Sequence, residues 1–354
     1  MLIHASRMLI MNSSKNLIKR PIKEFIILTI ALVLLIFSPL LSICFGAADI
    51  SFNDVFAIIY RLFGGEAEVS AIKERIVLEL RLPRIILAFL AGAGLSLSGA
   101  VLQTVTRNPL ADPYLFGISS GASFGAVLVL ASVGAASSMV SITGGAFLGG
   151  ALSVFMVVSL AGMGVQIERM LLAGVAVQFM FSSATSLVLY LSDPQAAASL
   201  LFWILGSFTR ASWDNLLIPT VIITFCLCVF LAFSRPLRAI LAGDESAKAL
   251  GVEVYRLRIG MLLLSSLLTA TLVASCGGIG FVGLMVPHIV RRILINRSHY
   301  VLIGSAVFGG IFMIWVDVLA RMLMENSELP VGIITAAMGS LFFLLVLKRR
   351  TTSS

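Results

Sequence analysis

The sequence predicts an all-α protein that crosses a membrane many times. Of its 354 residues, 59% are hydrophobic and only 12% are charged, and the mean hydropathy is +1.07. A soluble domain averages about 25% charged residues. Apolar runs long enough to span the hydrocarbon core, which takes about 20 helical residues, recur along the whole chain. Because these runs are continuous and do not alternate with polar residues, they indicate helices and not the strands of a barrel.

The hydrophobic segments number ten. We expect spans near residues 25–45, 84–105, 115–133, 139–161, 170–191, 213–233, 256–276, 301–319 and 331–347, and a shorter apolar helix near 283–295 that does not cross alone. The first 24 residues are basic and interrupted by polar residues, so no cleavable signal peptide is expected. The chain therefore divides into an N-terminal segment, 1–24, and a ten-helix transmembrane domain, 25–350.

Basic residues predict how the chain is oriented in the membrane. Threaded alternately from a cytoplasmic N-terminus, the segments place most of the 25 lysine and arginine residues inside, and the outer side is mostly acidic. This asymmetry is what the positive-inside rule requires, and it places both termini in the cytoplasm. The net charge of +8 is then a topology signal, and no nucleic-acid partner is expected.

Three arginines fall on the predicted outer side, against this trend. Arg81 and Arg84 belong to the stretch R-L-P-R at the start of the second span, and Arg321 follows the span near 301–319. Topology alone leaves two alternatives open. Arginines at a helix end commonly extend to lipid phosphates, but they also pair with carboxylates and would suit a partly exposed docking rim for an acidic partner.

The stretch R-N-P-L-A-D-P, residues 107–113, interrupts the chain at the cytoplasmic end of the second span. Proline lacks a backbone donor and disfavours helix in the residue before it, so a break is predicted here. Gly117, Gly121 and Gly125 then fall on one face of the next helix, and Gly145 and Gly149 repeat the spacing. Small residues four apart allow a neighbouring helix to pack closely.

The predicted cytoplasmic loop 235–258 has the pattern of a short helix. The run Gly243-Asp244-Glu245-Ser246 resembles a helix start with acidic residues in the first turn, which suits the helix dipole. Gly251 follows as a C-cap. The side chains between are mostly small, and such a helix suits insertion into a groove on another protein.

Motifs for catalysis are absent from the sequence. It contains no nucleotide-binding loop, no Gly-x-Ser-x-Gly and no His-Glu-x-x-His, and its four cysteines and three histidines are scattered. We therefore expect no catalytic site, no metal site and no cofactor. Asp317 is the main carboxylate within a span, whereas an ion-coupled carrier usually needs several. A secondary carrier that works without ATP remains the competing class.

Six motifs resemble, in order, the permeases of a known importer family. They are residues 81–103, 107–113, 171–176, 243–252, 278–291 and 328–339. The family imports iron siderophores, haem and cobalamin and consists of type II ABC importers. The resemblance implies a homodimer of ten-helix permeases, two cytoplasmic ATPases that bind ATP and Mg²⁺, and a periplasmic or lipoprotein binding protein. It also implies that this chain is a transport subunit and not an enzyme. The chain would span the bacterial cytoplasmic membrane in contact with its lipids.

The resemblance also implies roles for individual residues. The segment that matches the coupling helix, which docks on the ATPase, contains Gly243, Asp244, Glu245, Ser246, Ala247, Leu250 and Gly251. Arg81, Arg84 and Arg321 match positions that meet acidic residues of the binding protein, which favours docking over contact with lipid. Asn108, Pro109 and Leu110 match a cytoplasmic gate near the dimer axis. A ferric siderophore or haem is the expected substrate, with cobalamin as the alternative.

Overall fold

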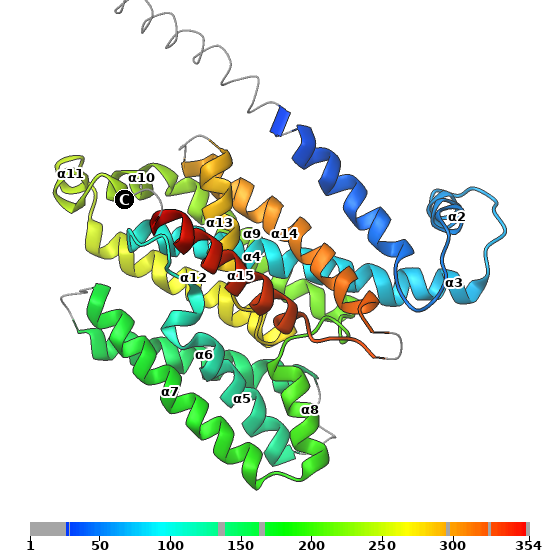
Figure 1. The fold of residues 1–354 in the computed structure, drawn as a ribbon, viewed down its shortest axis with the longest axis horizontal. Helices are drawn as coiled ribbons and strands as arrows, with labels where there is room; N and C mark the ends of the chain where they lie inside the picture. The colour runs from blue at the N-terminus through cyan, green and yellow to red at the C-terminus, as the bar shows by residue number, and fades with distance from the viewer. Residues whose placement is uncertain are drawn as a thin grey trace, which may run out of the picture.

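The computed structural model describes residues 26–27, 29–133, 139–162, 167–294, 298–324 and 327–351. Within these residues the protein is helical and has no strand, and the long helices form an elongated bundle (Figure 1). The N-terminal segment predicted at 1–24 lies outside the described part of the chain.

All ten predicted hydrophobic segments are helices, which confirms the all-α membrane fold. In the part of the chain that the structure describes, six helical segments are long and apolar enough to cross a membrane. They correspond to α4 (Leu82–Val105), α6 (Met139–Ala161), α7 (Ile167–Leu191), α9 (Trp213–Ala232), α12 (Val254–Cys276) and α14 (Ser298–Met322). The apolar part of the other four is shorter, and these are Thr29–Cys44, α5 (Ile118–Val133), α13 (Val282–Ile293) and α15 (Val331–Thr351).

Several short helices join these segments, and only α11 (Asp244–Ala249) was predicted from the sequence. The others are α2 (Phe52–Leu62), α3 (Ala71–Arg75), α8 (Pro194–Ile204) and α10 (Ser234–Leu241). α10 is apolar on one face only: it buries Leu237 and Ile240, while Arg235 and Arg238 are exposed. A search for spans of about 20 apolar residues misses helices of this kind.

α4 lies at the centre of the bundle, with α9, α12, α13 and α14 packed around it (Figure 1). In the segment that contains α4, 83% of the most apolar window is buried. Glycines bring the neighbouring backbones into contact: a Cβ atom on Gly99 would lie 1.7 Å from the Gly283 carbonyl oxygen. Since other helices, and not lipid, cover most of its apolar surface, α4 forms the core.

A second group of helices, α5 to α8, lies beside this core and contacts it through α5, α6 and α12 (Figure 1). The glycine spacing predicted for tight packing lies between α5 and α6. A Cβ atom on Gly125 would lie 2.0 Å from the carbonyl oxygen of Gly145, and one on Gly121 would lie 2.4 Å from that of Gly149. The backbones of α5 and α6 are therefore in direct contact over two turns.

One helical segment, residues 71–105, connects the two ends of the bundle. α3 continues into α4 through a π-helical turn, Ile76–Arg81, just before Pro83, which has no N–H to donate. At 1.5 Å per residue, α4 is about 36 Å long. Arg81 and Arg84 consequently lie at the end of the bundle near α2 and α3, and residues 107–113 lie at the opposite end near α10 and α11 (Figure 1).

Candidate functional site

The proline loop, residues 107–113, is held in a tight turn by two short polar side chains. Asn108 accepts a hydrogen bond from the backbone N–H of Leu110 at 2.9 Å, and Asp112 accepts one from Tyr114 at 2.8 Å. These local bonds replace the helical ones that the prolines prevent. Pro109 and Leu110 are exposed, whereas Asp112 is buried. The loop thus presents a leucine from a fixed turn.

Asp112 has an unusual environment for a carboxyl group outside the spanning helices. It is 7% exposed, and its Oδ2 atom has no hydrogen-bond partner among the described residues. Burial raises the pKa of Asp112 to about 6, and the hydrogen bond from Tyr114 opposes this shift in part. The charged form is disfavoured because no cation compensates for the lost water. The group therefore titrates within two units of neutral pH.

Two arginines from other helices bind the carbonyl groups at the C-terminal end of α4. Arg258 of α12 donates through Nε to the carbonyl oxygen of Val105 at 3.0 Å. Arg291 of α13 donates through Nη2 to the carbonyl oxygen of Ala100 at 2.9 Å and to Thr104 Oγ1 at 2.8 Å. A helix C-terminus carries partial negative charge, so both cations stabilise it. The helix that precedes the proline loop thus ends at a fixed point.

The helix α11 has one residue turned into the protein and the rest turned out. Ala247 is fully buried, so it anchors α11 to its own chain, while Leu250 is 73% exposed. Gly243 and Gly251, which flank α11, have φ angles of +115° and +79°, a region that side chains rarely adopt. The surface that α11 offers to a partner consists of Glu245, Ser246, Lys248, Ala249 and Leu250. Ala247 is not part of it.

Asp244, the first residue of α11, connects this helix to the proline loop. Its Oδ1 atom lies 3.2 Å from Arg107 Nη2 and 3.0 Å from Arg258 Nη2. Arg258 is the same residue that binds the end of α4. The segments predicted as gate and coupling helix are therefore joined by one carboxylate.

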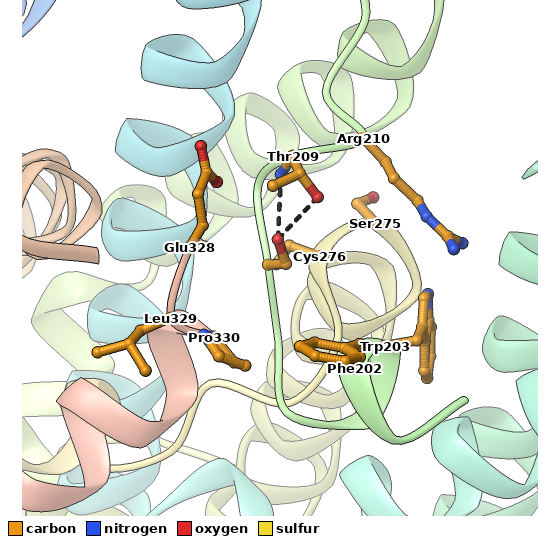
Figure 2. A pocket seen from close by; sticks show the side chains of 10 residues that line it. Phe202, Trp203, Thr209, Arg210, Ser275, Cys276, Glu328, Leu329 and Pro330 are labelled. Atoms are coloured by element: carbon orange, nitrogen blue, oxygen red, sulfur yellow. Dashed lines mark hydrogen bonds between the residues drawn. The ribbon is translucent and has the colours of Figure 1, made fainter. Parts of the chain in front are cut away.

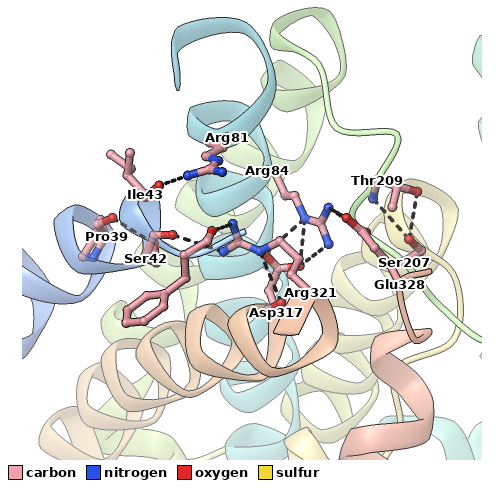
Figure 3. A network of polar contacts seen from close by, with 11 residues as sticks. Pro39, Ser42, Ile43, Arg81, Arg84, Ser207, Thr209, Asp317, Arg321 and Glu328 are labelled. Carbon is pink, nitrogen blue, oxygen red and sulfur yellow. Dashed lines mark hydrogen bonds and ion pairs between the residues drawn. The ribbon is translucent and has the colours of Figure 1, made fainter. Parts of the chain in front are cut away.

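The opposite end of the bundle contains a second charged group, the arginine network, formed by Arg81, Arg84, Arg321, Asp317 and Glu328 (Figure 3). Asp317, with a side chain 1% exposed, pairs with Arg84 at 2.8 Å and with Arg321 at 3.1 Å. Arg84 also pairs with Glu328, which is 40% exposed, at 2.8 Å. A buried carboxylate needs such partners, and the charge of Asp317 is balanced by these two arginines.

The structure turns the predicted docking arginines inward. Arg81 donates to the carbonyl oxygens of Ile43 and Ala48, and Arg321 donates to those of Phe45 and Ser42 (Figure 3). Their exposed fractions are 6% and 9%, and the Arg84 side chain is 12% exposed. The sequence analysis expected a partly exposed rim. A guanidinium group carries five N–H donors in a plane, and here backbone carbonyls at the end of the helix Thr29–Cys44 and just after it accept from them.

A cavity of about 190 Å³ lies beside the arginine network (Figure 2). Phe202, Trp203, Arg210 and Glu328 are among the residues that line it. Glu328 belongs to both features, since it also pairs with Arg84. α8 supplies the two aromatic rings, and this helix was not predicted from the sequence because its apolar run is too short to span a membrane.

These features occur in a chain with many relatives. The model of the FecCD transport family matches residues 34–349. The Fe(3+)-citrate import system permease protein YfmD of Bacillus subtilis (strain 168) is 35% identical over 333 residues, which cover 94% of this chain and 97% of the relative. The hemin transport system permease protein HmuU of Yersinia pestis is 35% identical over 328 residues, which cover 91% and 96%.

The chain belongs to the FecCD transport family. A solved structure of an inward-facing metal-chelate type ABC transporter agrees with this, because it matches with a TM-score of 0.79 and 33% identity over 91% of this chain and 99% of that one. The FecCD chain is a multi-pass membrane permease subunit of an ABC importer, and ATP is bound by a partner ATPase subunit. Membership implies ATPase and binding-protein partners.

For a FecCD permease, the predicted site residues fall into two groups at opposite ends of α4. The proline loop and α11 lie together at one end, and Arg81, Arg84 and Arg321 lie together at the other. Sequence reasoning missed the ion pairs that organise each group. Within the described residues, no three His, Cys, Asp or Glu side chains gather closely enough to hold a metal ion.

Proposed function

We propose that this permease forms, as a homodimer, the membrane pathway through which an ABC importer takes up a ferric chelate. The observation that carries the proposal is that one buried helix, α4, joins two charged sites at opposite ends of an apolar bundle. Such an arrangement suits a transporter that receives its substrate at one end and is driven from the other. The bacterial relatives favour a cytoplasmic membrane of a bacterium, and the distribution of basic residues favours both termini in the cytoplasm.

At the cytoplasmic end, we place the contact with the ATPase on α11. Its exposed residues Glu245, Lys248 and Leu250 form a small surface of mixed character, which suits a groove on another protein. Asn108, Pro109 and Leu110 form the gate in this proposal. Leu110 is 41% exposed and would meet its counterpart in the second subunit.

At the outer end, we place the binding protein over the arginine network. Arg84 supports this role because its partner Glu328 is 40% exposed and an acidic group on the binding protein would compete for the same guanidinium. Arg81 and Arg321 support the surface indirectly, since they hold the backbone of residues 42–48. Charge complementarity of this kind raises the association rate and weakens with salt.

The substrate follows from relatives and not from the geometry. Relatives named for Fe(3+)-citrate and for hemin favour an iron chelate, either a ferric siderophore or haem. Other relatives are named for cobalamin and molybdate, and cobalamin remains the alternative. The secondary-carrier hypothesis loses support, because Asp317 pairs with two arginines and is not free to couple an ion.

Reconstitution tests the proposal. The permease is expressed with the candidate ATPase and placed in proteoliposomes with the binding protein. We then measure ATP-dependent uptake of ⁵⁵Fe-labelled ferric citrate, and of haem, cobalamin and molybdate in parallel. Uptake of an iron chelate that requires ATP supports the proposal. Uptake driven by an ion gradient without the ATPase contradicts the transporter class, and exclusive uptake of cobalamin or molybdate contradicts the substrate.

The outer docking site has a separate test in the association kinetics of the binding protein. Replacing Glu328 by Gln removes the chain's own competing carboxylate from Arg84 and should speed association at low salt. Glu79→Gln is the matched control, because Glu79 is exposed and pairs with Arg75 one helical turn away. Unchanged kinetics for Glu328→Gln would argue against docking at Arg84.

A further inference from the structure

We propose that Asp244 and Arg107 form the link through which movement of α11 reaches the proline loop. The inference rests on the proposed function, in which α11 docks on the ATPase and the proline loop is the gate. Both residues act by positioning: in this proposal they bind neither substrate nor nucleotide. Their contact would convert a displacement of α11 into a displacement of the turn that presents Leu110.

The contacts form a closed ring of three chain segments. One oxygen of Asp244 accepts from Arg107 at 3.2 Å and from Arg258 at 3.0 Å. Arg258 in turn donates to the carbonyl oxygen of Val105, the last residue of α4, at 3.0 Å. Arg107 follows Val105 by two residues, so the ring joins the start of α11, the start of α12 and the stretch that leads from the end of α4 into the proline loop.

The backbone conformation of Arg107 is a second observation that supports a role for its side chain. Its φ angle is +51°, in the left-handed region that commonly ends a helix and is usually occupied by glycine. An arginine at this place carries backbone strain, and the contacts of its side chain offset that cost. The guanidinium group lies over the turn before α11, since a Cβ atom on Gly243 would sit 3.9 Å from Arg107 Nη1.

Few other routes lead from α11 to the proline loop. α11 packs mainly on α10 and α12, and its one buried side chain is Ala247. The two ends of the link also differ in freedom: the Arg258 side chain is 9% exposed, whereas that of Arg107 is 40% exposed. Arg258 thus fixes Asp244 to the core, and Arg107 is the partner that can move.

The exposure of the Arg107–Asp244 pair indicates that it contributes to conformational change and not to the stability of the fold. The side chains of Arg107 and Asp244 are 40% and 34% exposed, and ion pairs this open to water contribute little to stability. A weak contact can still bias an equilibrium between two conformations of the gate, because coupling between sites in proteins is typically about 5-fold to 150-fold. Loss of the contact should therefore uncouple hydrolysis from transport and leave the fold intact.

Arg107→Met is the decisive variant, because Arg107 is not on α11 and the change leaves the ATPase-docking surface untouched. We measure ⁵⁵Fe-labelled ferric citrate taken up per ATP hydrolysed by the full complex in proteoliposomes. The expected result is a complex that keeps its ATPase subunits while uptake per ATP falls about 5-fold, the lower end of the coupling found between sites in proteins. Arg107→Lys, which keeps the charge, should restore part of the ratio.

Arg256→Met is the matched control. Arg256 lies in the first turn of α12, two residues before Arg258. It is 81% exposed and pairs with Glu253, so its loss should leave the ratio at the parental value. The double variant Arg107→Met, Asp244→Asn should be close to Arg107→Met alone, because the contact between Arg107 and Asp244 is already lost in the single variant and an amide oxygen at position 244 can still accept from Arg258. If Arg107→Met does not assemble, Asp244→Asn alone is expected to show the same loss.

Two results would overturn the link, and neither can be confused with failure of the proposed function. Parental uptake per ATP in Arg107→Met, or in Asp244→Asn where that variant replaces it, shows that the contact transmits nothing. If uptake and ATP hydrolysis fall equally, the contact between Arg107 and Asp244 has a structural role only. Failure of the proposed function instead appears in the parent complex, as absence of ATP-dependent uptake or of a bound ATPase.

Discussion

At one end of the bundle Asp317 is 1% exposed and pairs with Arg84 and Arg321, whereas at the other end Asp244 is 34% exposed and pairs with Arg107 and Arg258. Each carboxylate thus binds two arginines, but in a different medium. A buried pair is expensive to break because an unpaired buried charge remains. A half-exposed pair is weak and is replaced readily by water. The outer network therefore holds one geometry, and the inner one permits exchange between geometries.

The backbone follows the same division. Arg81 and Arg321 bind carbonyl oxygens of residues 42–48, which fastens the first helix to α4 and α14. The inner loop is instead held by side chains that bond only two residues away. Local bonds of this kind move as a unit, so the proline loop is able to shift without breaking them. We expect substitutions at the two ends to separate loss of stability from loss of coupling.

Removing the buried carboxylate should have the largest effect on stability. Asp317→Asn leaves Arg84 and Arg321 without their common partner, and breaking a buried pair in this way costs about 3–5 kcal/mol. Chemical unfolding of the purified permease in detergent measures the change. Glu328→Gln removes the exposed partner of Arg84 and should cost less than about 1 kcal/mol. If the two substitutions lowered the free energy of unfolding equally, the buried pairs at this end would be no more important for stability than the exposed pair.

Asp112 should make the inner end sensitive to pH. Its pKa is about 6 in the folded protein, raised by burial from 3.8, so the folded state keeps a proton that the unfolded chain has released. Stability contributed by this group is then present below about pH 4 and is lost as the pH rises to about 6. Relative to the parent, Asp112→Asn should gain up to about 3 kcal/mol between pH 4 and pH 7. Unfolding curves at these two values measure the gain, and an identical pH dependence in both proteins would contradict it.

Substitutions at Ala247 and Leu250 should distinguish the residue that anchors α11 to its own chain from the residue that contacts the ATPase. Ala247 is fully buried and Leu250 is 73% exposed. Ala247→Leu overfills the contact that fixes α11, which typically costs about 1–3 kcal/mol, so both stability and transport should fall. Leu250→Ala should leave unfolding unchanged and weaken only the retention of the ATPase. Thermal unfolding and co-purification measure the two effects, and the same outcome for both variants would mean that α11 has no distinct inner and outer sides.

Sequence patterns predicted the helices well because membrane spanning requires long apolar runs. The span expected near 301–319 is observed as Ser298–Met322, and the break after residue 105 follows from the two prolines. α8 escaped prediction because its 11 residues are too few to span. Its place beside the arginine network depends on tertiary packing and not on its own composition.

The candidate sites were predicted less completely than the helices. Basic residues indicate a side of the membrane, but they do not indicate whether a guanidinium group points to water or to a backbone carbonyl. Arg81 and Arg321 are buried because they bind backbone carbonyls, and both lie at the end of the bundle opposite the proline loop. Asp244, Arg107 and Arg258 are far apart in the sequence, and no spacing rule brings them together. Only the packing of α4, α11 and α12 does so.

The smallest expected effect on stability belongs to Asp244→Asn. This substitution removes the same charge as Asp317→Asn, but from a pair whose side chains are 34% and 40% exposed, so the change should stay within about 1 kcal/mol. Arg258 retains its bond to the carbonyl oxygen of Val105 and is not left without a partner. The midpoint of unfolding measures the effect under the conditions used for Asp317→Asn. A loss of several kcal/mol would place Asp244 among the residues that hold the fold, and the contrast between a rigid outer end and an adjustable inner end would then be wrong.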